Sequence, residues 1–542
     1  MHDAAHASAA HDSHGRTDPT LYLIGAALAA YGLAALFGWP QYGRDLLVQA
    51  QAAHHATDHA ATPDAATPDA ATPDAATPDA AHPPAADHAT VSPPLPTVLP
   101  FVLLLGAIAV LPLTPQFSHW WEHNSSKLLV AGLLGLVTLA YYTFFHRHPV
   151  DLHFPAHATV APAAAGPSWS TAVTVLANAL LSEYVPFIVL LFALYCITGG
   201  VRIEGDLQAT PTVNAAFLGI GGLMASFIGT TGAAMLLVRP LLETNKERRL
   251  VAHTLVFFIF VVCNCGGCLL PIGDPPLFLG YLQKVPFFWT LSLWKPWLIT
   301  NGLLLAGYWL WDTFYAQPRE QTADIIRDVR AAGPLKISGL WPNALLLAGV
   351  IAAVALLDPS KTLPGTTWHP WIYLREAVLL TLVGLSLLLG SREVRRKNGF
   401  AYGAILEVAA LFVGIFICMQ PALALLNTHG ASLGVDSPRA FFWATGLLSS
   451  VLDNAPTYLV FFTVAGIDPR DGLLGLEDAR LVGISLGAVF LGAMTYIGNG
   501  PNFMVKAIAE QAGVKMPSFF GYMLYSFGVL LPIFALVSYL FL

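Results

Sequence analysis

The sequence predicts an all-α polytopic membrane protein with two inverted repeats, each containing a re-entrant hairpin and a broken helix. Of the 542 residues, 55% are hydrophobic and only 11% are charged, and the mean hydropathy is +0.61. Apolar stretches recur along the chain, and at ~20 residues per span they supply about 11–13 transmembrane segments. Four of the longest stretches are interrupted near their middle by helix-breaking residues.

Residues 1–40 comprise a His-rich N-terminus and a first apolar helix over Leu21–Phe37. A signal peptide cleaved after Ala50-Gln51-Ala52 is the alternative. However, only one arginine, Arg16, precedes the helix, and the spacing to that site is long, so we expect an uncleaved helix. Nine of the 18 histidines lie in the first 88 residues. A metal-binding tail is one interpretation, and we favour a polar tail with no site.

Residues 41–95 are of low complexity. The motif Ala-Thr-Pro-Asp-Ala occurs four times between Ala61 and Ala80 and is followed by Pro-rich sequence. A proline at every fifth position removes a backbone donor and clashes with the preceding helical turn. Because this composition cannot form a packed core, we expect a disordered linker.

The remaining chain divides into two repeats, 96–316 and 340–541, each with four ordinary spans, a hairpin and a broken helix. The hairpins are expected at 213–241 and 438–466, and the broken helices at 252–291 and 480–512. Backbone freed from helical hydrogen bonds cannot face lipid, so four breaks predict an internal polar site. A bundle with proline kinks is the alternative, but four breaks at matching places favour the inverted repeats of secondary transporters.

Three loops are rich in Lys and Arg, at 239–249, 319–336 and 392–397. The positive-inside rule places them in the cytoplasm. The first hairpin then begins and ends inside, and the second begins and ends outside. We therefore expect a multi-pass protein of the inner (plasma) membrane, with a cytoplasmic N-terminus and an extracytoplasmic 41–95 linker.

The breaks contain most of the polar side chains found within the apolar stretches. The candidate ion- or substrate-binding residues are Thr230, Thr231, Asn264, Asp274, Asp453, Asn454, Asn499 and Asn502. Hard cations prefer such oxygen ligands. An aspartate at membrane depth costs ~2.5–3.5 kcal/mol and therefore commonly marks a transport pathway.

A carboxylate removed from water also binds a proton more readily, so one group can hold Na⁺ or H⁺ in turn. Asp453, Asp274 and Glu183 are the candidates for proton coupling. The alternative for both aspartates is that they only cap the helices that follow. For the threonines and asparagines, the alternative is that they only satisfy free backbone groups.

All five cysteines lie in apolar segments, which excludes a secreted disulfide framework. Cys263, Cys265 and Cys268 have the spacing of a metal cluster but lack a second pair, so we interpret them as small packing residues. The sequence contains no P-loop and no His-Glu-x-x-His motif, which argues against ATP-driven transport and against an enzyme. We expect no nucleic-acid partner and no cofactor other than the transported Na⁺ and H⁺.

Four stretches together resemble the ion transporter superfamily: Gly229-Thr-Thr-Gly-Ala-Ala-Met-Leu-Leu-Val-Arg-Pro240, Asn264 to Leu279, Asp453-Asn-Ala-Pro-Thr457 and Tyr496-Ile-Gly-Asn-Gly-Pro-Asn502. The resemblance is to NhaD-type Na⁺/H⁺ antiporters and to the related arsenite and citrate (CitMHS-like) permeases, and it covers residues 130–541. It implies a homodimer in which a domain with both hairpins moves as an elevator.

Dicarboxylate transporters of this superfamily carry Ser-Asn-Thr at both hairpin tips, whereas this chain has Thr-Thr-Gly and Asp-Asn-Ala-Pro. This departure disfavours a bare carboxylate anion. We therefore expect a secondary Na⁺/H⁺ antiporter in the lipid bilayer, with a small cation as substrate and an elevator-type alternating-access mechanism. The alternative is a citrate, dicarboxylate or arsenite transporter of the same superfamily.

Overall fold

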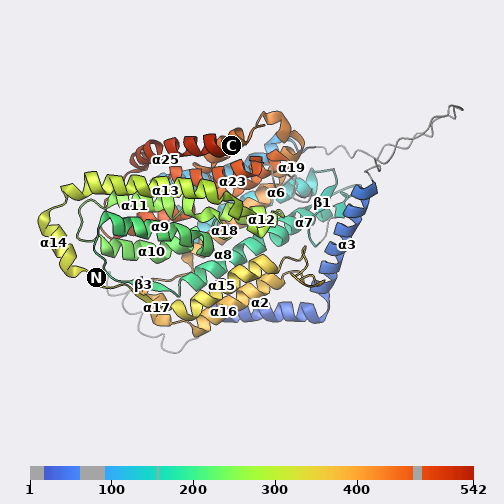
Figure 1. Ribbon diagram of the computed structural model, residues 1–542. Helices are drawn as coiled ribbons and strands as arrows, with labels where there is room; N and C mark the ends of the chain where they lie inside the picture. The colour runs from blue at the N-terminus through green and yellow to red at the C-terminus, as the bar shows by residue number, and fades with distance from the viewer. Residues whose placement is uncertain (1–17, 61–91, 156–157, 468–478) are drawn as a thin grey trace, which may run out of the picture.

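The computed structural model describes residues 18–60, 92–155, 158–467 and 479–542. The chain is almost entirely helical, and most of its helices run roughly parallel in one bundle (Figure 1). The described strands form two short antiparallel pairs. These pairs are β1 (Val150–Leu152) with β2 (Ala158–Val160), and β3 (Arg202–Glu204) with β4 (Lys336–Ser338). The prediction of an all-α polytopic protein with broken helices is confirmed.

Helix α2 (Pro19–Leu36) begins where the Asp18 side chain accepts a hydrogen bond from the Thr20 N–H. Helix α3 (Trp39–Ala60) follows it. The prediction of a disordered linker is therefore wrong for 41–60, where alanine-rich sequence without an internal proline after Pro40 favours helix. The His-rich N-terminus and the Pro-containing repeats, at 1–17 and 61–91, lie outside the described residues.

The first half of the bundle contains eleven described helices before the chain reaches β4. They are α4 (Leu99–Val110), α5 (Ser118–Trp121), α6 (Asn124–Phe144), α7 (Trp169–Ala177), α8 (Val185–Thr198), α9 (Pro211–Ile228), α10 (Thr230–Thr244), α11 (Ala252–Val261), α12 (Pro275–Leu282), α13 (Trp294–Trp311) and α14 (Thr322–Ala331). A π-helical turn (Asn178–Tyr184) joins α7 to α8.

The second half continues from β4 to the C-terminus. Its described helices are α15 (Leu340–Leu356), α16 (Leu374–Leu389), α17 (Arg392–Lys397), α18 (Gly403–Cys418), α19 (Gln420–His429), α20 (Pro438–Ser449), α21 (Asn454–Ala465), α23 (Ala479–Leu491), α24 (Gly500–Gln511) and α25 (Phe519–Phe541).

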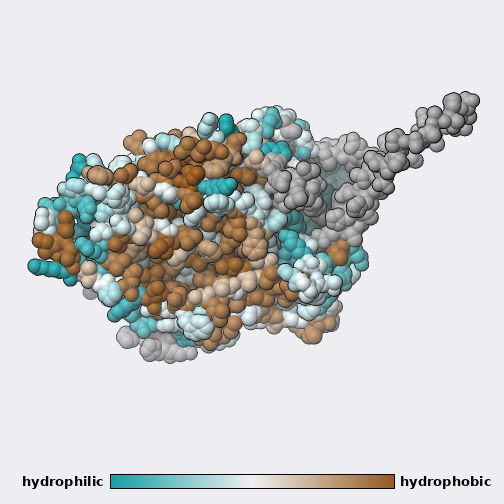
Figure 2. Space-filling model, in the orientation of Figure 1, coloured by the Kyte–Doolittle hydropathy of each residue, from teal (hydrophilic) through white to brown (hydrophobic). Residues whose placement is uncertain are grey.

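Five of the described helices are long and apolar enough to cross a membrane, or up to six if α18 and α19, bent by 43°, form one span. Four further apolar helices are shorter, and two of them belong to the predicted broken segments: Ala252–Cys268 and Ala479–Met494. Hydrophobic residues cover most of the visible face of the bundle (Figure 2). A surface of this kind suits lipid contact and not water.

The order hairpin, broken helix, final helix occurs in both halves of the bundle: α9 to α13, and again α20 to α25. The two hairpins also begin in the same way. Thr210 accepts a hydrogen bond from the Val213 N–H at 3.2 Å, and Ser437 accepts one from the Ala440 N–H at 3.2 Å. In each case a proline occupies the first helical position, where its missing N–H costs nothing.

The two halves meet at several places, which include α6 against α18, α8 against α16 and the second arms of both hairpins. Helix α10 packs against α24, and α21 packs against α12. Each hairpin therefore contacts the broken helix of the opposite half. This packing between the halves brings the interrupted segments of both to one place inside the bundle.

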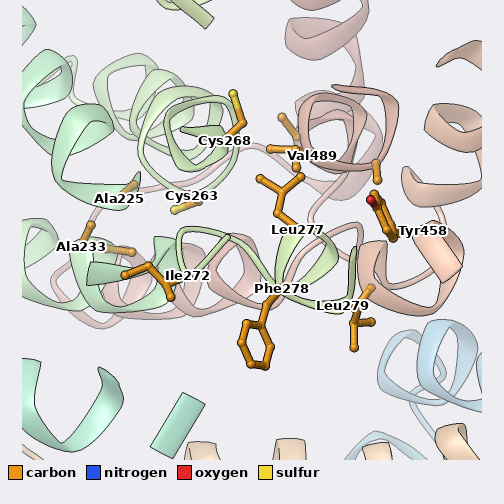
Figure 3. Packing of buried hydrophobic residues seen from close by; sticks show 14 of the residues in the cluster. Ala225, Ala233, Cys263, Cys268, Ile272, Leu277, Phe278, Leu279, Tyr458 and Val489 are labelled. Atoms are coloured by element: carbon orange, nitrogen blue, oxygen red, sulfur yellow. The ribbon is translucent and has the colours of Figure 1, made fainter. Parts of the chain in front are cut away.

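Small residues allow the first broken helix to approach its hairpin closely. A Cβ on Gly266 would lie 2.5 Å from the Gly222 Cα, so neither position has room for a side chain. Cys263 and Cys268 are free, fully buried and surrounded by apolar side chains such as Ala225 (Figure 3). This environment is the one expected for packing thiols.

Candidate functional site

Asp274 lies at the centre of the interrupted segments and is 1% exposed. It directly precedes α12, but its side chain does not cap that helix. Three other side chains donate to it. The Thr230 hydroxyl contacts Oδ1 at 3.0 Å, the Asn499 amide contacts Oδ1 at 3.2 Å, and the Asn454 amide contacts Oδ2 at 2.9 Å. The capping interpretation of Asp274 is therefore wrong.

These three donors come from three different elements. Hairpin 1 consists of α9 and α10, and hairpin 2 consists of α20 and α21. Thr230 is the first residue of α10, and Asn454 is the first residue of α21. Asn499 precedes α24, the second half of the other broken helix. One carboxylate thus joins both hairpin tips to both broken helices.

Asn264 and Asn502 form a second layer of the site. The Asn264 amide donates to Asn502 Oδ1 at 2.8 Å and to the Ile259 carbonyl at 2.8 Å. The Asn502 amide donates to the Gly492 carbonyl at 2.9 Å. These side chains satisfy backbone groups that the broken helices leave without helical partners, as a buried break requires.

Asp274 and Asn499 occupy equivalent positions in the two halves. Each follows a glycine, Gly273 or Gly498, whose added Cβ would overlap a backbone carbonyl six residues earlier. Each also precedes a proline in the first turn of the next helix. Because one position carries a carboxylate and the other a neutral amide, the centre of the site is chemically asymmetric.

The hairpin tips are held by local geometry. Gly229 ends α9 with φ of +80°, a conformation that favours glycine, and the next N–H, of Thr230, donates to the Gly273 carbonyl at 2.8 Å. At the other tip, Asp453 accepts a hydrogen bond from the Ala455 N–H at 3.1 Å and thereby caps α21. The capping alternative describes Asp453 well, and a coupling role for it stays a prediction.

Six predicted residues thus lie together: Thr230, Asn264, Asp274, Asn454, Asn499 and Asn502. Among the residues that the structure describes, Thr231 and Glu183 make no hydrogen bond to this group. Glu183 is buried in the π-helical turn and lies 3.5 Å from the Gln420 amide, where α18 meets α19.

The described contacts of Asp274 are all with neutral groups. Within the described residues, no lysine, arginine or histidine forms an ion pair or a hydrogen bond with Asp274. The Asn454 Oδ1 atom is buried without a hydrogen-bond partner. A bound cation would satisfy both a buried carboxylate without a positively charged partner and a buried carbonyl oxygen without a hydrogen-bond donor.

A family model described as "Putative citrate transport" matches residues 134–542. The chain belongs to this family. The match includes both hairpins, both broken helices and all six residues of the site. It confirms the resemblance to CitMHS-like transporters, so the chain is a multi-pass membrane transporter. Among curated proteins, no match to the chain is found.

In this member of the citrate transport family, three further hydroxyl side chains hydrogen-bond to backbone carbonyls at the helix breaks. They were not identified from the sequence. Ser226 donates to the Gly266 carbonyl at 2.6 Å, Ser449 donates to the Ala488 carbonyl at 2.7 Å, and Thr495 donates to the Ser450 carbonyl at 2.5 Å. Ser226 and Ser449 lie at matching places shortly before the two hairpin tips. That repeat-related position is the only sequence signal that could have identified them.

Proposed function

We propose that the protein is a secondary active transporter that carries a citrate-type carboxylate anion together with a cation, and that the cation binds at Asp274. Membership of the citrate transport family supports the carboxylate substrate. The observation that carries the cation site is the contact of Asp274 with neutral groups from both halves, without a basic side chain.

The charge of the site explains why the anion would need a cation. Asp274 and the nearby hairpin-tip residue Asp453 would repel a di- or trivalent anion in a medium of low dielectric constant. A cation bound between them and the substrate removes this repulsion. Amide groups such as that of Asn454 can then reorient and donate to the substrate carboxylates.

Transport also requires access to a residue that is 1% exposed. We propose that the two hairpins and the two broken helices move together, in the manner of an elevator, relative to α6, α8, α16 and α18. Cross-packing of α10 with α24 and of α12 with α21 supports movement as one body, because each half holds the other's hairpin.

A second candidate function is Na⁺/H⁺ antiport, in which Asp274, Asp453 and Glu183 exchange the two cations. One observation favours it: among the described residues, the groups that contact Asp274 are neutral and include no arginine or lysine that could bind a carboxylate anion. In this case the same site would bind Na⁺ without an accompanying anion.

Purified protein in liposomes with a trapped pH dye separates these functions. We expect labelled citrate to accumulate when an inward Na⁺, H⁺ or Mg²⁺ gradient is imposed, and not without a gradient. Antiport would instead give Na⁺-dependent alkalinisation of an acidic lumen in the absence of citrate. If the wild-type protein is well folded and no cation gradient drives either citrate uptake or proton exchange, the proposal is wrong.

A further inference from the structure

Helix α14 is amphipathic with its polarity reversed relative to a helix on a water-exposed surface. Asp324 and Asp328, four residues apart, face the protein and are 3% and 5% exposed. Ile325, Ile326 and Val329 face outwards and are 39%, 47% and 53% exposed. A surface helix in water normally buries its apolar face and exposes its charges.

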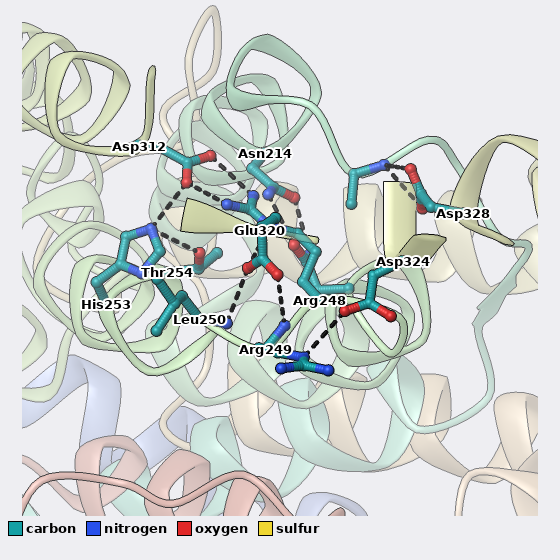
Figure 4. A network of polar contacts seen from close by, with 12 residues as sticks. Asn214, Arg248, Arg249, Leu250, His253, Thr254, Asp312, Glu320, Asp324 and Asp328 are labelled. Atoms are coloured by element: carbon teal, nitrogen blue, oxygen red, sulfur yellow. Dashed lines mark hydrogen bonds and ion pairs between the residues drawn. The ribbon is translucent and has the colours of Figure 1, made fainter. Parts of the chain in front are cut away.

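Specific partners account for the buried acidic face. Both carboxylate oxygens of Asp328 accept from the Ala209 N–H, at 3.2 and 3.0 Å, just before α9 begins. Asp324 accepts from Arg249 Nε at 3.0 Å, just before α11 (Figure 4). Glu320, on the segment that leads into α14, accepts from the Arg249 and Leu250 N–H groups at 3.0 and 2.9 Å.

These contacts fix α14 to the starts of two moving elements of the proposed mechanism. Helix α9 is the first arm of hairpin 1, and α11 is the first half of its broken helix. Arg248, beside Arg249, also forms an ion pair with Asp312 at the end of α13, which accepts from His253 at 3.0 Å (Figure 4). Both acidic residues on the inner face of α14 therefore have hydrogen-bond partners in the protein, whereas the apolar residues on its outer face are exposed.

The position of α14 identifies the medium that its outer face meets. The helix lies across one end of the bundle, crosswise to α13 (Figure 1). The chain between α13 and α14 carries Phe314 and Tyr315, which are 71% and 51% exposed, and Arg319 lies 3.7 Å over the Tyr315 ring. Exposed aromatic and basic residues at the end of a span are typical of the membrane–water interface.

The charges on the outer face indicate which lipids it meets. The exposed charged residues of α14 are Arg327, which also forms an ion pair with Asp324, and Arg330. Both acidic residues of the helix are buried. At this end of the molecule, hydrophobic residues lie among hydrophilic ones (Figure 2). An apolar stripe beside arginines matches a helix that lies in the bilayer surface and attracts anionic headgroups.

We propose that α14 lies in the headgroup region of the bilayer, with Ile325, Ile326 and Val329 inserted towards the acyl chains and Arg327 and Arg330 bound to anionic phospholipid. The helix then links the lipid surface to the starts of α9 and α11. This inference rests on the geometry of α14 and holds for either transported substrate.

Depth-dependent fluorescence quenching of the full-length chain in liposomes tests the proposal. An environment-sensitive fluorophore is attached to the variant Ile326→Cys. The control is Thr367→Cys, in an exposed loop. Because all five native cysteines are buried, the fluorophore should label only the introduced cysteine. We expect a nitroxide on the lipid headgroup to quench position 326 at least twofold more than aqueous iodide does, and the reverse at position 367. Quenching at 326 should be stronger when the nitroxide is on phosphatidylglycerol than on phosphatidylcholine, and the double variant Arg327→Gln, Arg330→Gln should lose this difference.

Three results would overturn the proposal. Iodide quenching at 326 equal to that at 367 would place α14 in water. Protection from both quenchers, with cross-linking of Ile326→Cys to a second copy of the chain, would make the outer face a contact between subunits. Equal quenching by both lipids in the wild-type background would remove the role of anionic headgroups.

Discussion

Thr230 and Thr231 are adjacent at the tip of hairpin 1, but only Thr230 donates to Asp274. Thr230→Val keeps the shape of the side chain and removes that hydrogen bond. Because this bond is present without a cation, and a hydrogen bond to a charged group contributes ~1.5–3 kcal/mol, we expect Thr230→Val to lower the free energy of unfolding by about that amount. Thr231→Val is the matched control. Equal thermal unfolding midpoints for the two variants would show that the Thr230–Asp274 hydrogen bond does not stabilise the site.

Asp453 combines a capping hydrogen bond with a charge, and two substitutions separate these roles. Asn caps a helix about as well as Asp, so Asp453→Asn should leave thermal stability unchanged and, if the carboxylate takes part in coupling, abolish cation-driven transport. Asp453→Ala should additionally cost about 1 kcal/mol of stability through loss of the cap. Full transport by Asp453→Asn would establish that Asp453 only caps α21.

The sequence predicted which polar residues would gather in the site because each one is polar, or breaks a helix, within an apolar stretch. The sequence could not predict which of these residues contact each other. Asn499 and Asp274 are 225 positions apart, and Asn454 and Asp274 are 180 positions apart. Thr231 and Glu183 are also polar residues within apolar stretches, but in the described structure only Thr230 of the two tip threonines donates to Asp274, and Glu183 lies 3.5 Å from the Gln420 amide.

At the level of elements, close packing of glycines maintains the broken helices. A Cβ at Gly273 would overlap the Gly267 carbonyl, whereas a Cβ at Gly302, on α13, would meet no atom within 4 Å. We expect Gly273→Ala to destabilise the protein by about 1–3 kcal/mol, as overpacking of a tight contact does. Gly302→Ala should leave the thermal unfolding midpoint unchanged or slightly higher. Equal midpoints for both variants would mean that the break tolerates a side chain.

The sequence located the breaks well because prolines and glycines act locally. The structure ends α9 at Ile228 and begins α12 at Pro275, beside the predicted breaking residues. Some helices were not anticipated, among them α3 and α14. Helix α3 lies in a stretch whose later prolines suggested disorder throughout. Helix α14 was included in a basic loop, since its reversed amphipathicity becomes evident only when its contacts with the bundle are known.

At the scale of the whole molecule, the proposed movement requires hairpin 1 to slide past α8. A Cβ at Gly232 would lie 3.6 Å from the Thr198 Cβ, which suits a disulfide, where this distance is ~3.5–4.5 Å. We expect the double variant Thr198→Cys, Gly232→Cys to lose transport when oxidised and to regain it when reduced. Each single variant is a control. Undiminished transport by the fully cross-linked protein would exclude relative motion of these two helices.

Cation binding at Asp274 is the claim on which the other proposals about transport depend. Its most direct test is thermal unfolding of the purified chain during titration with Na⁺, Li⁺, K⁺ and Mg²⁺, because a ligand that binds only the folded state raises the unfolding midpoint. We expect at least one of these cations to stabilise the wild-type chain and the control Asp436→Asn. Asp274→Asn, whose amide would face the Asn454 donor, should lose this stabilisation while remaining folded. An undiminished shift in Asp274→Asn would place the cation elsewhere and contradict the account.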